Sequence, residues 1–457
     1  MSFPRYESYR DSGVEWLGDV PEHWCLRKLK TIASFAGGGT PNRDNLAFWN
    51  GDIPWVSPKD MKAEGIYDTE EHITIEALES SAANIRRAGE VLLVVRSGIL
   101  RHTIPVAINF VSVALNQDMK ALAFQSDKCL PDFFLRWVQG LNKELLLVWG
   151  KQGATVESIE HTFLAETQIP LPPLEEQSAI AAFLDRETAK IDALVEEQRR
   201  LIELLKEKRQ ALISHTVTKG LDSETPMKDS GVEWLGEVPA HWLIGPVGAR
   251  YDVQLGQMLN EERTRGDFLK PYLRVFDVQW DSINTEDLPQ MNFPPSAQVR
   301  YQLKPGDLLV NEGGSYVGRS AIWRGEIEEC YYQKALHRLR ARDPSTETAE
   351  FFLFVMEMAT QVGVFVAEGN QTTIDHLTAE QLRATRVAFP PPLEQKAIAE
   401  YLQRETANLL ALIEEIASAI ALLQERRSAL ISATVTGKID VRGQVAEAKA
   451  PEEAAAA

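Results

Sequence analysis

Cationic side chains recur at alternate positions in the segment QKALHRLRAR, residues 333 to 342. Alternate residues of a β-strand share one face, so a strand here would place its cations in one row. The row consists of Lys334, Arg338, Arg340 and Arg342. Such a row could contact nucleic-acid phosphates, or it could be a solvated strand surface.

Further basic residues flank glycine-rich turns in both halves of the chain. In the first half they surround the stretch VLLVVRSG, and in the second half they surround EGGSYVGRS. Two basic faces, one in each half, favour contact with the DNA backbone. The predicted DNA-binding residues are Arg43, Arg96, Arg101, His102, Arg319, Arg324, Lys334, Arg338, Arg340 and Arg342.

Catalytic signatures are missing from the sequence. It contains no GxxxxGK[ST] phosphate loop, no HExxH and no GxGxxG between a strand and a helix. The glycines at 37 to 39 predict a turn in preference to a phosphate cradle. We therefore expect no catalytic residue, metal or cofactor, although an enzyme with an unrecognised active site, such as a single-chain endonuclease, stays an alternative.

Composition indicates a multidomain protein of the reducing cytoplasm. The chain has 457 residues, 48 basic against 66 acidic side chains, and a net charge of −18. None of its three cysteines forms a CxxC pair, and no uninterrupted apolar run reaches the length of a membrane span. Net charge describes solubility and steering and says little about any one face.

The chain is a tandem repeat. DSGVEWLGDVPEHW at residue 11 returns as DSGVEWLGEVPAHW at residue 229, and residues 176–222 return at 394–440 with the same offset of 218 and 27 of 47 identities. The intervening regions share only scattered matches. One scaffold thus carries two different surfaces, and the repeated tryptophans favour apolar anchors over base-stacking platforms. They are Trp16, Trp24, Trp234 and Trp242.

The variable regions predict α+β domains. Strands are expected at 91–95, 106–115 and 307–310, and helices at 132–150 and 350–366. Each region ends at a proline cluster, after which the chain has no Gly or Pro from Glu175 to Ser214 or from Glu394 to Ser432. At about 1.5 Å per residue, each stretch could form a helix on the order of 60 Å long.

Both predicted helices carry an apolar residue at every seventh position, which indicates a helix pair. The companion positions 187, 194, 201, 208 and 215 are mixed, which favours a short-range pair over a long fibrous dimer. Antiparallel packing would relate the two halves by a pseudo-two-fold axis. The predicted seam is Leu184, Ile191, Leu205, Leu212, Leu402, Leu409, Ile416, Leu423 and Leu430.

The first half contains the motif SGVEWLG.VP.HW, a variable region and the motif PPLEEQ.AI...LD.ETAKID, which then recur in the same order in the second half. In this arrangement, the sequence resembles specificity (S) subunits of type I restriction-modification enzymes. The resemblance spans residues 9 to 440. It includes GGGTPNRDNLAFWNGDIPWVSPKD in the first half, and PYLRVFDV and KPGDLLVNEGG in the second.

The resemblance implies a non-catalytic subunit whose two target recognition domains read a split site on double-stranded DNA. Partners would be two modification (M) subunits, which use S-adenosylmethionine, and restriction (R) subunits, which use ATP and Mg²⁺, with no membrane contact. The expected domains are residues 1–173 and 223–391, the spacer helices 174–222 and 392–440, and a disordered tail 441–457. A coiled-coil scaffold without DNA function is the remaining alternative.

Overall fold

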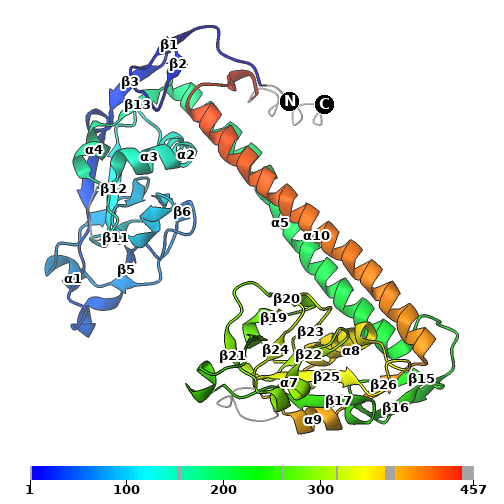
Figure 1. Ribbon diagram of the computed structural model, residues 1–457. Coiled ribbons are helices and arrows are strands. Elements are labelled where there is room, and N and C mark those ends of the chain that lie inside the picture. The colour runs from blue at the N-terminus through cyan, green and yellow to red at the C-terminus, as the bar shows by residue number, and fades with distance from the viewer. Residues whose placement is uncertain (1–2, 152–155, 260, 315–316, 366–375, 445–457) are drawn as a thin grey trace. The chain divides into compact units, whose positions relative to one another are not determined.

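The computed structural model describes residues 3–151, 156–259, 261–314, 317–365 and 376–444 (Figure 1). The chain forms two units, residues 1–199 with 417–457 and residues 200–416. Each unit combines an α+β domain, a short hairpin and segments of both long helices. The predicted α+β class is confirmed.

The first domain contains two sheets and four short helices. The five-stranded sheet has the order β4 (Ala33–Gly37), β12 (Met119–Phe124), β9 (Val91–Val94), β10 (Val106–Asn109) and β6 (Gly65–Ile66). The four-stranded sheet has the order β7 (His72–Ile73), β5 (Trp49–Val56), β11 (Val113–Leu115) and β8 (Ile85–Arg86). The helices are α1 (Ile75–Glu79), α2 (Pro131–Gly140), α3 (Asn142–Trp149) and α4 (His161–Glu166). Buried aromatic residues of α2, including Phe133 and Trp137, join the sheet to the long helices in one core.

The second domain repeats the central strand order with different flanks. Its four-stranded sheet runs β17 (Tyr251–Leu255), β25 (Leu336–Ala341), β22 (Leu308–Asn311) and β23 (Ser320–Ile322). A three-stranded sheet contains β21 (Gln290–Asn292), β18 (Leu269–Leu273) and β24 (Tyr331–Tyr332), and β19 (Val278–Gln279) pairs with β20 (Ser282–Ile283). The helices are α6 (Val247–Arg250), α7 (Pro295–Tyr301), α8 (Ala349–Gln361) and α9 (Ala379–Ala384).

A short hairpin leads into each domain. The hairpins are β1 (Tyr9–Asp11) with β2 (Asp19–Pro21), and β14 (Met227–Asp229) with β15 (Glu237–Pro239). The next strand then pairs with the last strand of its domain, β3 (Cys25–Lys28) with β13 (Gln168–Leu171) and β16 (Leu243–Pro246) with β26 (Arg386–Phe389). Both ends of each domain therefore meet where a long helix begins.

A carboxylate fastens this junction in both units, buried in the first unit (Glu176) and half-buried in the second (Glu394). Trp24 Nε1 donates to Glu176 Oε1 at 3.0 Å, and His23 Nε2 lies 2.8 Å from Glu176 Oε2. Trp242 and His241 repeat both distances with Glu394. Trp24 and Trp242 are fully buried, which confirms them as anchors. Trp16 and Trp234 are half-buried and pack beside the same cores.

The long helices are α5 (Leu174–Lys219, 46 residues) and α10 (Pro392–Val435, 44 residues). Each begins after a proline cluster, because proline suits the first helical turn and cannot continue the preceding strand. Acidic side chains in the first turn complement the helix dipole. Beyond their ends, Gly220 and Gly437 adopt positive φ angles of 76° and 72°, which suit a glycine that terminates a helix.

Within each unit, a segment of α5 lies antiparallel to a segment of α10 (Figure 1). In the first unit, Ile431 and Val435 share a core with Ile180 and Leu184. In the second unit, Ile398 and Leu402 share a core with residues 213 and 217 of α5. The two helices therefore exchange roles between the units: the start of α5 packs in the first core, and the start of α10 packs in the second.

All nine predicted seam residues are buried or half-buried. The companion row on α5 was assigned wrongly at residues 194, 201, 208 and 215, which are exposed. The inward companions lie four positions after the seam residues and include Thr188 and Val195, at 3% and 7% exposure. The apolar positions of a heptad, a and d, are separated alternately by three and by four residues, and the four-residue step from d to the next a is the one found here.

Three further boundaries differ from the sequence prediction. Residues 106–115 form two strands in different sheets, and residues 132–150 form two helices. The tail predicted from residue 441 begins with buried Val441 and with Arg442, which lies over the Tyr6 ring at 5.0 Å. The rest of that predicted tail, residues 445–457, lies outside the described residues.

By length and composition alone, one described helix, α10, could cross a membrane, since an 18-residue window has a mean hydropathy of 1.6. One such helix is weak support for a membrane span. Glu414 and Glu415 interrupt its apolar sequence. The seam residues of α10 pack towards α5 within each unit, so part of its apolar character serves the helix pair.

Replacing Glu176 by Ala should lower the free energy of unfolding by about 2–4 kcal/mol, because it leaves buried donors unpaired. Glu176 is 5% exposed and also accepts from Tyr6 Oη at 2.6 Å. Glu394→Ala should cost less, since that side chain is 27% exposed. Calorimetric unfolding tests both variants, with exposed Glu175→Ala as the control. Equal melting temperatures of the Glu175→Ala and Glu176→Ala variants would contradict the stabilising role of Glu176.

Candidate nucleic-acid interface

In both units, the backbone that leaves the first strand of the central sheet passes very close to another backbone segment, and a glycine lies at that point. We call this close approach the crossing, and we call the loops around it the loop end of the unit. A Cβ atom on Gly38 would lie 2.2 Å from the carbonyl oxygens of Leu115 and Asn116, and one on Gly256 would lie 2.3 Å from Gln333 O. Only glycine allows so close an approach. The two glycines are 218 residues apart, so the crossing belongs to the repeated scaffold although the surrounding sequence differs.

Arg96 and Arg101 lie on the segment that joins β9 to β10 in the first unit, each beside an acid. Arg96 Nε donates to Asp118 at 2.6 Å, and Arg101 Nε lies 3.4 Å from Glu157. Both arginine side chains remain more than half exposed, at 52% and 67%. His102 follows on the same exposed turn. The structure thus places these three predicted residues on the exposed segment between β9 and β10.

Arg43 is held on a tryptophan platform. Its guanidinium donates to both oxygens of Glu71, at 2.6 and 3.1 Å, and lies 4.6 Å from the centre of the Trp49 ring. The Glu71 hydrogen bond raises the pKa of Arg43, and Arg43 correspondingly lowers the pKa of Glu71. The side chain is 56% exposed, so a preoriented cation faces solvent.

A lysine–histidine contact beside the first crossing escaped the sequence analysis. Lys120, paired with Gly37 across β12 and β4, has its Nζ 3.1 Å from His161 Nδ1. Burial lowers the pKa of Lys120, and burial together with Lys120 lowers the pKa of His161. The two residues are 41 positions apart, and no motif links them in the sequence.

In the second unit, Lys334 lies directly at the crossing. Its backbone N–H donates to Gln257 O at 2.7 Å, and its exposed side chain makes no ion pair among the residues that the structure describes. The next residue, Ala335, has φ of 97°, so regular strand alternation begins only after it. Arg324 Nη2 donates to Asp281 at 2.6 Å, and Arg319 donates to Gln279.

The predicted row of exposed cations is wrong for Arg338 and Arg340. Arg338 is 3% exposed and donates to Asp252 at 2.6 Å. Arg340 forms two bonds of 2.6 Å with Asp307, which is 1% exposed. Each pair has one buried charge that requires its partner, Asp307 in one and Arg338 in the other, so these arginines hold the sheet together. Arg342 is exposed but its Nε donates to Gly248 O.

A second preoriented arginine was also missed. Arg274 donates to both oxygens of Asp277, at 2.8 and 2.9 Å, and lies 4.2 Å from the centre of the Phe276 ring. Phe276 is 55% exposed. The segment RVFD, with Arg and Asp three residues apart, was the available signal. Both units thus present an arginine that is fixed by an acid and stacked on an aromatic ring.

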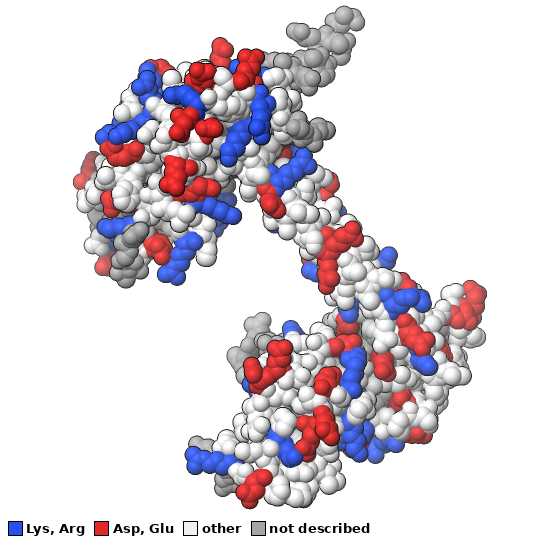
Figure 2. All heavy atoms as spheres, turned by 45° about the horizontal axis from the view of Figure 1, so that its top comes forward, with Lys and Arg blue, Asp and Glu red and all other residues white. Residues whose placement is uncertain are grey.

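Cations and anions are interspersed over the visible face of the molecule, without one continuous basic patch (Figure 2). Within the described residues, no group of three or more His, Cys, Asp or Glu side chains could hold a metal ion. The site therefore offers oriented hydrogen-bond donors and aromatic faces, which suit binding of a polar polymer.

The family model for the type I restriction modification DNA specificity domain matches residues 21–204 and 291–422. The Escherichia coli type I restriction enzyme EcoR124I/EcoR124II specificity subunit is 34% identical over 198 residues, 43% of this chain and 46% of that relative. The MjaVIII specificity subunit of Methanocaldococcus jannaschii is 23% identical over 97% of this chain and 98% of its own length.

Solved structures share the fold. A chain from a study of complex assembly and conformational transition in the type I R-M system has a TM-score of 0.65 at 18% identity, covering 91% of this chain and 98% of that one. The HsdS subunit from Thermoanaerobacter tengcongensis has a TM-score of 0.55 at 16% identity, covering 92% and 98%. The alignments with EcoR124I/EcoR124II and with the MjaIX subunit span only 46% and 59% of those relatives.

Replacing Lys334 by Ala should reduce the salt dependence of DNA binding by about one unit, since a phosphate contact releases one counterion. The melting temperature should not change. By contrast, Arg340→Ala should destabilise the protein by about 3 kcal/mol, because it leaves Asp307 buried and unpaired. Salt titration of binding and thermal unfolding test the two variants. Wild-type stability of Arg340→Ala would overturn its structural assignment.

Proposed function

The chain belongs to the type I restriction-modification DNA specificity family, and we propose that it is the non-catalytic subunit that reads a two-part target on double-stranded DNA. The observation that carries the proposal is the repeated loop end. The Gly38 and Gly256 crossings recur at the same offset, whereas the side chains around them differ. One scaffold with two different surfaces suits two different half-sites.

The long helices supply the spacer in this proposal. At about 1.5 Å per residue, helices of 46 and 44 residues extend over about 65–70 Å. We propose that they hold the readers about 40–60 Å apart, roughly 12–18 base pairs at 3.4 Å per step. The target would then consist of two short half-sites around an unread gap.

The same helices supply a docking surface. Their outward faces carry exposed leucines, whose apolar surface a bound partner would remove from water. On α10 these include Leu412 and Leu422, at 46% and 66% exposure. We propose that they bind two modification subunits, which use S-adenosylmethionine, and that restriction subunits with ATP and Mg²⁺ join the complex in the cytoplasm.

Co-expression with the adjacent modification gene, followed by long-read detection of methylated adenine on plasmid DNA, tests this function. We expect one motif in two parts separated by a fixed number of unspecified bases. A continuous methylated motif would contradict the two-reader proposal. Cleavage of plasmid by the purified chain with a metal ion would instead favour a single-chain endonuclease.

Replacing Leu409 by Asp should disrupt the helix pair, because Leu409 is 7% exposed and an unpaired buried charge costs several kcal/mol. Binding of the modification subunit should fail with it. The matched control is Leu412→Asp on the same helix, where the aspartate remains solvated. It should keep wild-type unfolding and lose only modification-subunit binding, as measured by size-exclusion chromatography. Wild-type complexes with both variants would refute the seam and docking assignments.

A further inference from the structure

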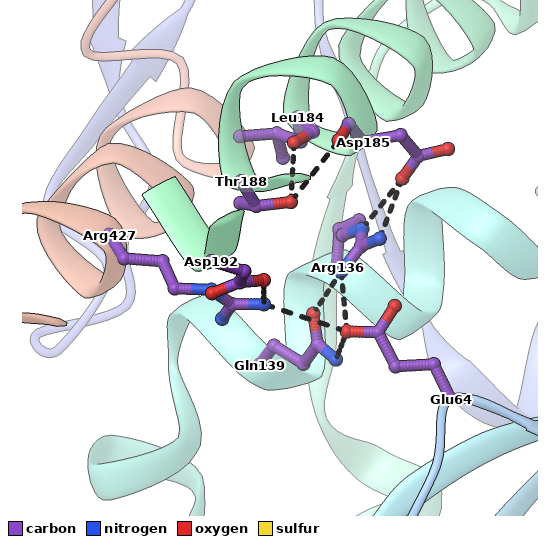
Figure 3. A network of polar contacts seen from close by, with 8 residues as sticks. All are labelled: Glu64, Arg136, Gln139, Leu184, Asp185, Thr188, Asp192 and Arg427. Carbon is purple, nitrogen blue, oxygen red and sulfur yellow. Dashed lines mark hydrogen bonds and ion pairs between the residues drawn. The ribbon is translucent and has the colours of Figure 1, made fainter. Parts of the chain in front are cut away.

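A buried arginine joins the first domain to its helix pair. Arg136, on α2, has a side chain that is only 9% exposed. It donates to Asp185 of α5 through Nε at 3.0 Å and Nη2 at 2.6 Å, and to Glu64 of the domain through Nη1 at 2.8 Å (Figure 3). The planar fork therefore spans two acids on different elements, which fixes its direction.

A second arginine approaches the same site from α10. Arg427 donates to both oxygens of Asp192 on α5, at 2.8 and 3.1 Å, and its Nη2 lies 3.8 Å from Glu64 (Figure 3). Gln139 completes the contacts, accepting from Arg136 and donating to Glu64, both at 2.8 Å. Glu64 is thus linked to α2 and to α10 at once.

The electrostatics keep these groups charged. Burial by itself would raise the pKa of Glu64, but Arg136 and Gln139 bring it below its usual value. Burial would lower the pKa of Arg136, and its two carboxylate partners raise it instead. Such pairs add little net stability compared with apolar packing. Their distinctive property is geometric, because apolar surfaces tolerate small shifts and a forked ion pair does not.

In the second unit, different residues join the domain to its helix pair. The positions 218 residues after Arg136, Asp185 and Asp192 are occupied by Phe354, Gln403 and Leu410, so the three-acid network does not recur. The equivalent of Arg427 does recur as Arg209, whose guanidinium bonds both oxygens of Glu357 on α8. A repeated helix arginine therefore reaches an acid of its own domain in each unit.

We propose that the domain latch, defined as Glu64, Arg136, Gln139, Asp185, Asp192 and Arg427, sets the angle of the first recognition domain on its helix pair. It thereby selects the gap length that the chain accepts between half-sites. The inference rests on the two-part target proposed above. Arg136 is a positioning residue here, since its side chain is 9% exposed and its guanidinium is engaged by Glu64 and Asp185.

Arg136→Met tests the latch with little risk to folding. Methionine preserves the apolar stem, and the released carboxylates of Glu64 and Asp185 are 43% and 57% exposed, so water can solvate them. Asp185→Asn, changed only on the helix side, is the second variant. The control is Glu187→Gln, because Glu187 pairs with Arg186 and Lys190 of its own helix.

The first readout is binding of the assembled methyltransferase to duplexes whose gap is shortened or lengthened by single base pairs. Wild type and Glu187→Gln should prefer one gap sharply. Arg136→Met and Asp185→Asn should lower that preference by about tenfold, with unchanged half-site bases. Equal loss of affinity for every gap, or an unchanged optimum, would overturn the latch. A wild type that accepts any gap would instead overturn the two-part target.

The second readout needs no DNA. In a Cys25→Ser background, spin labels at Lys143→Cys in the domain and Ala193→Cys on α5 report the distance between domain and helix by pulsed electron resonance. All these label positions are exposed, and the other two cysteines are buried. The distance distribution should be narrow with the latch intact and broader in Arg136→Met. Identical distributions would overturn the latch whatever the DNA experiment shows.

Discussion

The carboxylate in the first turn of each long helix makes the contact on which the rest of the structure depends. Glu176 and Glu394 each accept hydrogen bonds from a tryptophan and a histidine that follow the entry hairpin of the domain. Each carboxylate therefore ties the beginning of a domain to the helix that follows it. Because the donors sit outside the variable sheet, the domain between them can change its surface without loosening this junction.

That constraint explains why the two halves of the chain match closely at the junctions and differ in the regions between them. A glutamine directly follows each of these carboxylates in the sequence and accepts a hydrogen bond from the backbone N–H just before a domain helix. Gln177 accepts from Leu130 at 2.8 Å, and Gln395 accepts from Thr348 at 3.0 Å. These contacts fix where α2 and α8 begin. The sheet order and the glycine crossing then place the loops, and only the loop side chains need differ between two readers.

The sequence predicted the repeat, the long helices, the seam and the buried tryptophans because each depends on local pattern. The surface charges were harder to predict, since their partners are distant in the chain. Arg338 and Asp252 are 86 residues apart, and Arg340 and Asp307 are 33 apart. Alternation places both arginines on one face but cannot say whether that face meets water or an acid. The Lys120–His161 contact was missed for the same reason.

Paired cations also bear on how an acidic chain could recognise DNA. With a net charge of −18, the free chain has little long-range attraction for phosphates. Arg43, Arg96 and Arg274 are each held by a carboxylate, so a phosphate contact there must compete with an existing bond. This competition weakens phosphate contacts, which do not depend on sequence. A base edge that matches the fixed direction of a guanidinium binds without the entropy cost of ordering the arginine side chain, because that side chain is already ordered. In the proposed function, discrimination between sequences then comes from oriented donors, and affinity comes from the partners that the helices assemble.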